Sequence, residues 1–299
     1  MSLRSSIRDL LTKHPDVYRF YTRLRYGSRT DVRDWVLSCQ KFMQEHELNN
    51  FIFEKDETYV RIQSGHEFKY VPAQMGGLLG LEYKKGFESE DIQSVLKLLP
   101  DDPVVLDVGA NFGIYSVLIA ASSKASQVHS FEPVRHTAAL LHTNAERNSV
   151  RDRITINNVA VGSEPGNLLI TSDRYAGNYL LQNTSYGGSS QEVPVIRLDD
   201  YVLEKGIQRI DFIKCDVEGA ELLVMKGARR LLSSMHPIVM LEIADEWTSR
   251  FGYSATDLKA YMLDAGYNCK HGSEVAADLG LESVGASKTH NYFFFPGTK

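Results

Sequence analysis

From residue 104 onward, short apolar runs alternate with segments in which apolar residues recur every three or four positions. The apolar runs span residues 104–108, 127–132, 154–161, 211–216 and 238–243. The helical pattern covers residues 114–121, 134–147 and 220–232. Runs of the first kind predict strands, and their alternation with helices predicts an α/β fold in which helices cover both faces of a parallel sheet.

A segment of different composition interrupts this alternation between the third and fourth runs. Residues 166–171 and 192–198 have the pattern of two further strands. The residues between them, 173–191, are polar and rich in Gly, Ser, Asn and Tyr, which is typical either of a lid over a site or of a surface loop. As a lid, this loop could stack its tyrosines on a sugar ring: Tyr175, Tyr179 and Tyr186.

The two ends of the chain follow other patterns. Residues 1–50 have helical spacing, residues 51–63 alternate like a hairpin, and residues 75–83 form a glycine-punctuated loop. The patterns after that loop predict a helix over 88–100, a helix over 254–266, a strand at 267–271, a loop, and a last strand over 291–295. We therefore expect an N-terminal helical and hairpin extension over residues 1–80 and one domain over residues 81–299.

Composition narrows the class of protein. Hydrophobic residues make up 43% of the chain, charged residues 24%, and the net charge is −5, which is typical of a globular protein that does not bind nucleic acid. No apolar run is long enough to span a membrane, and the N-terminus lacks the pattern of a secretory signal. Three widely spaced cysteines suggest reduced thiols, so we expect a cytoplasmic protein: Cys39, Cys215 and Cys269.

The stretch from Arg4 to Arg33 is rich in Arg and Lys, which aspartates interrupt. It has the pattern of a solvated helical arm, and the alternative is contact with an anionic membrane surface or a charged glycan. The sequence indicates neither an oligomeric state nor a transmembrane segment.

A glycine turn follows the first strand of the domain, in "VVLDVGANFGIYS". Such a turn, opening a helix at the carboxyl end of a strand, suits NAD, a phosphate or S-adenosylmethionine. A dinucleotide turn has the pattern G-x-G-x-x-G, but Asn111 replaces its middle glycine, and Asp107 would repel a pyrophosphate. Glu132 ends the second strand, where its carboxylate can accept hydrogen bonds from both ribose hydroxyls. These details favour S-adenosylmethionine, whose sulfonium and amino groups are positive.

The chain resembles the FkbM-type methyltransferase family. The resemblance rests on "LDVGANFGIYS", "SFEPVRHTAALLHTNAERN", "NNVAVGSEPGNL", "IRLDDYV", "IDFIKCDVEGAELLVMKGARRLL", "PIVMLEI" and "HNYFFF", in the family's order over about residues 82–296. It implies a class I, Rossmann-like methyltransferase fold, with a seven-stranded sheet whose last strand is antiparallel. It also implies S-adenosylmethionine as cofactor and, as acceptor, an oxygen of a sugar or other small molecule.

The resemblance assigns cofactor contacts to residues of this chain. The turn would be shaped by Gly109, Ala110, Asn111 and Gly113. Asp107 would help to hold the methionine end, and Glu132, followed by Pro133, would bind the ribose. The adenine would lie beside Asn158, Val159 and Ala160, at the end of the third strand.

Candidates for catalysis lie at the ends of the later strands. Lys214 interrupts an apolar strand, where an unpaired ammonium is costly, and Asp216 ends that strand over the cofactor. Either these two residues form an ion pair or they act in catalysis. Glu218 is a candidate base or a carboxylate that favours a helix dipole. Glu242, at the end of the next strand, and His290, before the last one, are further candidate bases.

Three questions stay open at this stage. Asp216 and Glu242 could share a divalent metal such as Mg²⁺, although their spacing does not require one. An NAD-dependent oxidoreductase and a catalytically silent S-adenosylmethionine-binding module are the alternative functions. The identity of the acceptor is not encoded in any motif that we recognise.

Overall fold

The computed structural model describes residues 50–54, 57–62, 64–69, 71, 89–172, 188–281 and 290–297. The chain divides into two compact units, Met1–Phe87 and Glu88–Lys299, each of which is described by itself. In the first unit, three strands form an antiparallel sheet, which confirms the predicted hairpin: β1 (Asn50–Glu54), β2 (Glu57–Arg61) and β3 (Glu67–Lys69). The predicted N-terminal helices and the loop at 75–83 lie outside the described residues.

The second unit contains a seven-stranded sheet with the order β12-β13-β11-β10-β4-β5-β6. Its strands are β4 (Val104–Val108), β5 (Gln127–Phe131), β6 (Ile154–Asn157), β10 (Phe212–Cys215), β11 (Ile238–Glu242), β12 (Tyr267–His271) and β13 (Asn291–Pro296). The last strand, β13, is antiparallel to both of its neighbours. The predicted α/β class and the antiparallel last strand are confirmed.

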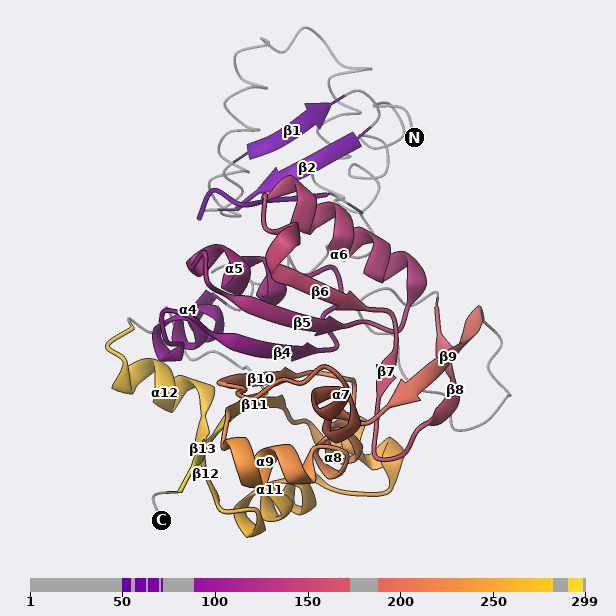
Figure 1. Cartoon of the computed structure of the whole chain (residues 1–299), viewed down its shortest axis with the longest axis vertical. Coiled ribbons are helices and arrows are strands. Elements are labelled where there is room, and N and C mark those ends of the chain that lie inside the picture. The colour runs from indigo at the N-terminus through magenta and orange to yellow at the C-terminus, as the bar shows by residue number, and fades with distance from the viewer. Residues whose placement is uncertain are drawn as a thin grey trace, which may run out of the picture. The chain divides into compact units, whose positions relative to one another are not determined.

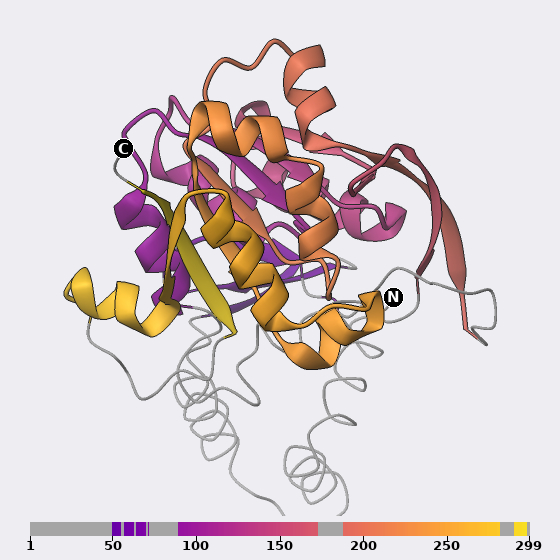
Figure 2. The ribbon, with the colours of Figure 1, turned by 90° about the horizontal axis from the view of Figure 1, so that it is seen from below.

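Helices cover both faces of this sheet (Figure 1). On one side lie α4 (Ser89–Leu98), α5 (Ile114–Ser122) and α6 (Arg135–Arg147). On the other side, which faces the viewer in Figure 2, lie α8 (Glu221–Lys226), α9 (Arg229–Met235) and α11 (Ala255–Asp264). The apolar residues of these helices pack onto the fully buried strands, whose residues Leu106, Ile213 and Val239 are 0% exposed. No helix in the described part of the chain is long and apolar enough to cross a bilayer.

The third predicted strand is wrong as one element, because the structure divides it between two sheets. Residues 154–157 form β6, whereas β7 (Ala160–Val161) pairs with β9 (Ser190–Ile196) in a small sheet. The third member, β8 (Gly166–Thr171), is antiparallel to β9, so the two extra strands are confirmed. Most of the expected lid, including its three tyrosines, lies outside the described residues.

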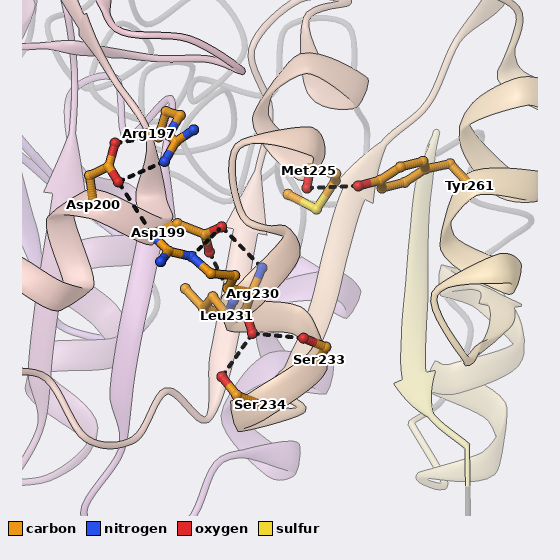
Figure 3. A network of polar contacts seen from close by, with 9 residues as sticks. All are labelled: Arg197, Asp199, Asp200, Met225, Arg230, Leu231, Ser233, Ser234 and Tyr261. Carbon is orange, nitrogen blue, oxygen red and sulfur yellow. Dashed lines mark hydrogen bonds and ion pairs between the residues drawn. The ribbon is translucent and has the colours of Figure 1, made fainter.

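The predicted helix over 220–232 is also wrong as a single element, since α8 ends at Lys226 and α9 begins at Arg229. The Gly227 carbonyl oxygen accepts from the Asp199 N–H at 3.0 Å instead of from the next helical turn, and a Cβ on Gly227 would lie 2.1 Å from the Gly162 carbonyl oxygen, which follows β7. Asp199 then accepts hydrogen bonds from the backbone N–H groups of Arg230 (3.0 Å) and Leu231 (2.8 Å), which stabilises the start of α9 (Figure 3).

Three short helices escaped the sequence pattern. They are α7 (Leu198–Glu204), α10 (Asp245–Thr248) and α12 (Gly272–Asp278), and the last replaces part of an expected loop. A capping box begins α12, because the His271 ring accepts from the Ser273 N–H and the Glu274 side chain accepts from the His271 N–H. Helices of four to seven residues show at most two turns of periodicity, which explains why apolar spacing did not reveal them.

Candidate functional site

The turn after β4 lies where the strand order reverses, between β4 and its neighbours β5 and β10. Gly109, Asn111 and Gly113 have φ of 74°, 52° and 92°, all in the left-handed region. The backbone N–H groups of Gly109 and Ala110 both donate to the Phe131 carbonyl oxygen at 3.0 Å. These bonds attach the turn to the end of β5, and the turn opens directly into the buried helix α5.

Packing requires both glycines of the turn. A Cβ on Gly109 would lie 1.8 Å from the backbone oxygen of Asp216, and one on Gly113 would lie 2.7 Å from Leu141 Cγ. Gly109 therefore lies directly against the residue that follows β10. This contact brings Asp216 against the turn, and a cofactor contact of Gly109 itself stays a prediction.

Glu132 organises the rim of the site from the end of β5. Its side chain is 7% exposed and accepts hydrogen bonds from the Asn111 N–H through Oε2 (2.9 Å) and from the Val134 N–H through Oε1 (2.8 Å). Burial raises the pKa of Glu132 to about 7, although both hydrogen bonds favour the charged form. The predicted ribose acceptor thus lies directly beside the predicted cofactor turn.

The three residues expected beside the adenine have different surroundings. Asn158 is exposed, and its Nδ2 donates to the backbone oxygens of Glu132 (2.8 Å) and Pro133 (2.9 Å), which fixes it at the rim. Val159 packs against the main core, whereas Ala160 is buried in the cluster around Val134. Asn158 is thus the member of this group whose side chain lies at the surface beside Glu132.

Lys214 is 5% exposed, and its ammonium has several polar neighbours. It donates to the Gly109 carbonyl oxygen at 3.0 Å and lies 3.3 Å from Asp216 Oδ2 and 3.8 Å from Asp107 Oδ1. It also lies over the Tyr115 ring, 5.4 Å from the centroid. The expected ion pair with Asp216 is present, and the lysine links β10 to the turn.

Asp107 is completely buried beneath the turn. Its Oδ2 accepts a hydrogen bond from Ser116 on α5, and Ser116 is in turn 2.7 Å from Ser130 Oγ on β5. Burial raises the pKa of Asp107, and the Lys214 ammonium opposes this shift. The described contacts support the local fold, and a contact of Asp107 with the methionine end of a cofactor stays a prediction.

Asp216 and Glu242 lie together at the carboxyl ends of β10 and β11. Burial favours the neutral form of Asp216, but the Lys214 ammonium and a hydrogen bond with Glu242 outweigh it and hold the pKa of Asp216 below its usual range. The side chain of Asp216 is 29% exposed. The structure therefore places an ionised, accessible carboxylate next to the turn, with a second carboxyl group in contact with it.

Two further glutamates follow β10: Glu218 lies in the turn, and Glu221 begins α8. Burial, together with the charges of Asp216 and Glu221, raises the pKa of Glu218 to about 8. Glu221, which the sequence pattern did not single out, is 0% exposed, and burial raises its pKa to about 7. A glutamate in the first turn of a helix is common, so only its burial distinguishes it.

His290 lies at the surface beside the end of β11. Its backbone oxygen accepts from the Ile243 N–H at 2.8 Å, and its ring meets the Trp247 ring edge-on, with centroids 5.7 Å apart. Among the described residues, no hydrogen bond or ion pair joins His290 to Asp216 or Glu242, and its role as a base stays a prediction.

The buried glutamates predict that the unfolding free energy of the ligand-free protein depends on pH. Glu221 has a pKa of about 7 when folded and an ordinary value of 4.5 when unfolded, so the folded state binds the extra proton between these values. Stability should therefore fall as pH rises from about 4.5 to 7, by roughly 1–3 kcal/mol for this group. Between pH 5 and pH 8, the unfolding free energy measured with urea should fall less in Glu221→Gln than in wild type. In the exposed control Glu246→Gln it should fall as much as in wild type. An equal fall in all three proteins would contradict the prediction.

The residues around the turn fit a ligand with a positive end and hydroxyl groups. Asn111 Oδ1 is a buried acceptor without a hydrogen-bond partner among the described residues, and it belongs to the turn itself. The Glu132 carboxylate binds the Asn111 N–H, and Asp216 lies against Gly109 at the other end of the turn; neither carboxylate would suit a pyrophosphate. For a metal, the described residues offer no group of three or more His, Cys, Asp or Glu side chains with suitable geometry.

Comparison with known proteins agrees with this geometry. The model of the methyltransferase FkbM domain matches residues 107–269, more than half of the chain. Methyltransferase sdnD of Sordaria araneosa is 28% identical over 43% of this chain and 61% of its own length. The 2-O-methyltransferase NoeI of Sinorhizobium fredii is 29% identical over 52% and 68%, and the hexuronic acid methyltransferase AglP of Haloferax volcanii is 28% identical over 51% and 61%. The chain therefore matches about three fifths to two thirds of the length of these relatives.

Proposed function

This chain belongs to the methyltransferase FkbM domain family, and we propose that it transfers a methyl group from S-adenosylmethionine to a hydroxyl oxygen of a sugar or another small molecule. The observation that carries this proposal is the juxtaposition at the sheet's switch point. There the turn of residues 109–113 and the Glu132 carboxylate lie on one side of the ionised Asp216. The turn and Glu132 can hold a nucleoside, and Asp216 can receive a proton.

The residues around the turn would hold the cofactor. Glu132 would accept hydrogen bonds from the ribose hydroxyls, Asn111 would use its unpartnered Oδ1, and Asn158 would lie beside the base. When bound, S-adenosylmethionine supplies a methyl group on a good leaving group. The protein then has two main tasks, which are to align the acceptor oxygen and to remove its proton.

Asp216 is the best candidate to accept that proton. Its low pKa keeps it ionised near neutral pH, whereas Glu218, with a pKa of about 8, holds its own proton there. The Lys214 ammonium stabilises the Asp216 carboxylate, and Glu242 is in contact with that carboxylate. We therefore assign proton removal to Asp216, with Glu242 as its partner.

The names of two relatives bear on the acceptor: one supports an oxygen as the methyl acceptor, and the other supports a sugar acid as the acceptor molecule. One is called a 2-O-methyltransferase and the other a hexuronic acid methyltransferase. A hydroxyl group has a pKa far above neutral, so its oxygen becomes a good nucleophile only as its proton leaves. A carboxylate base at the rim supplies that function. The size and linkage of the acceptor are left to experiment.

Two measurements test this proposal. In calorimetry, S-adenosylhomocysteine should bind the full chain and NAD should not; the reverse result would support an oxidoreductase instead. The second measurement is transfer of radioactive methyl from S-adenosylmethionine to methyl glycosides of hexoses and hexuronic acids. Asp216→Asn should lower the rate about 100-fold, while S-adenosylhomocysteine still binds. Binding without transfer to any hydroxyl compound of a broad panel would favour a silent binding module.

A further inference from the structure

We propose that Glu221 and Tyr253 are positioning residues, which hold the turn from Val217 to Gly219 and thereby place Asp216 for proton removal. The proposal rests on the function proposed above, because it concerns the same site. Neither residue is at a strand end, and neither touches the turn that would hold the cofactor. Their described hydrogen bonds are to the turn that directly follows Asp216, to the start of α8 and to each other.

Glu221 binds backbone N–H groups of this turn. It is 0% exposed, and its Oε1 accepts hydrogen bonds from the backbone N–H groups of Val217 (3.0 Å) and Gly219 (3.1 Å). A buried carboxyl group is costly unless it is hydrogen-bonded, and here both bonds go to one short segment. The Glu221 carboxyl group therefore supplies the hydrogen-bond acceptor that a neighbouring strand or helical turn would otherwise provide for these two N–H groups.

The turn needs such support because its backbone is unusual. Glu218 and Gly219 both have positive φ, 57° and 104°. For a residue with a Cβ, this conformation costs about 1 kcal/mol or more. A Cβ on Gly219 would lie 2.4 Å from the Trp247 backbone oxygen, so the turn is also pressed against the segment that follows β11. Without its hydrogen bonds, the turn would relax towards the ordinary regions of the backbone.

Tyr253 binds a backbone carbonyl oxygen of the same turn. Its hydroxyl donates to the Gly219 carbonyl oxygen (2.5 Å), accepts from the Leu222 N–H (3.2 Å), and lies 3.5 Å from Glu221 Oε2. Tyr253 precedes α11, so it connects the turn to a distant part of the chain. One hydroxyl group and one carboxyl group thus bind three backbone N–H groups and one carbonyl oxygen.

Asp216 lies between this turn and the cofactor turn. Its N–H donates to the Val108 carbonyl oxygen (3.1 Å), and its own carbonyl oxygen lies against Gly109. Its C-terminal neighbour, Val217, is the residue whose N–H binds Glu221. The direction of the Asp216 carboxylate is therefore determined from both sides, and loss of the Glu221 and Tyr253 contacts removes one of them.

Tyr253→Phe tests the proposal, and Tyr261→Phe is its matched control. The Tyr261 hydroxyl also donates to a backbone carbonyl oxygen, that of Met225 at 3.3 Å, but Met225 lies in the last turn of α8 and not in the segment that directly follows Asp216 (Figure 3). In amide hydrogen exchange of the full chain, Tyr253→Phe should speed exchange at residues 217–222, and Tyr261→Phe should not. Transfer to the best methyl glycoside should fall about 10-fold in kcat with Tyr253→Phe, and the KM for S-adenosylmethionine should change less than twofold.

Glu221 is tested by a conservative and a disruptive variant. Glu221→Gln keeps an oxygen for the two N–H groups, so it should retain kcat within about twofold, whereas Glu221→Leu should lose about 10-fold or more. Equal exchange in Tyr253→Phe and Tyr261→Phe would overturn the proposal. Faster exchange with unchanged kcat would overturn the positioning role and leave a structural one. If wild type transfers no methyl group, the proposed function fails, and with it the link to proton removal, while exchange still decides whether the two residues hold the turn.

Discussion

Replacing Gly109 with alanine should unfold the second unit or cost more than about 4 kcal/mol of its unfolding free energy. The added Cβ would lie 1.8 Å from the Asp216 backbone oxygen, and that oxygen belongs to the end of a buried strand. Neither backbone segment can withdraw, because Gly109 is hydrogen-bonded to Phe131 and Asp216 to Val108. A positive φ of 74° adds the usual cost for a residue with a side chain. Urea or thermal unfolding measures the loss directly.

Gly206→Ala is the matched control for this prediction. Gly206 also has positive φ, 65°, but a Cβ there would meet nothing within 4 Å. Its replacement should cost only about 1–2 kcal/mol, from the backbone conformation alone. The difference between the two variants isolates the contact between the turn and the end of β10. If Gly109→Ala were no less stable than Gly206→Ala, the close approach in this structure would be wrong.

Replacing Glu132 with alanine should weaken S-adenosylhomocysteine binding about 100-fold or more. Two charged hydrogen bonds to ribose hydroxyls, each contributing roughly 1.5–3 kcal/mol, would be lost. The variant also leaves the N–H groups of Asn111 and Val134 without their acceptor, which loosens the turn itself. Calorimetry at fixed pH gives the dissociation constants. Glu146→Ala, an exposed change on α6, should leave them unchanged.

The same glutamate predicts how cofactor binding depends on pH. The pKa of Glu132 in the ligand-free protein is about 7, and hydroxyl donors favour its charged form. S-adenosylhomocysteine should therefore bind more tightly at pH 8 than at pH 6, and binding should release protons between these values. A pH-independent affinity in wild type, or an equal pH dependence in Glu132→Ala, would show that Glu132 does not bind the ribose.

Much of the fold could be predicted from the pattern of apolar residues. The five apolar runs of the α/β part lie on strands, because a parallel strand that is covered on both faces must be apolar throughout. The three short helices were missed because they are too short to show a period, whereas the two wrong element boundaries come from contact between distant segments. The helix after β10 breaks where Gly227 meets Gly162, and the third run divides because Ala160 pairs with Val195 in another sheet. Neither contact leaves a trace in local periodicity.

Some residues of the candidate site could likewise be predicted from the sequence, and others could not. Glu132 and Asp216 could be predicted because a polar residue that ends an apolar run stands at the rim of a parallel sheet. Lys214 could be noticed because a charge within such a run needs a partner. Glu221 could not, since an acid in the first turn of a helix looks ordinary until its complete burial is seen. Tyr253 lies 34 positions from the carbonyl oxygen to which it donates, and no spacing rule connects them.

By itself, the sequence determined the α/β class, the family and the strand-end positions of the polar residues, because these depend on local composition and on motifs that are read in order. The tertiary structure decided which of those residues meet. It placed Lys214 between Asp107 and Asp216, pressed Gly109 against the end of β10, and brought Tyr253 to the turn after Asp216. Such contacts depend on the packing of segments that are far apart in the chain, and burial and charge at those contacts set the pKa values on which the proposed chemistry depends.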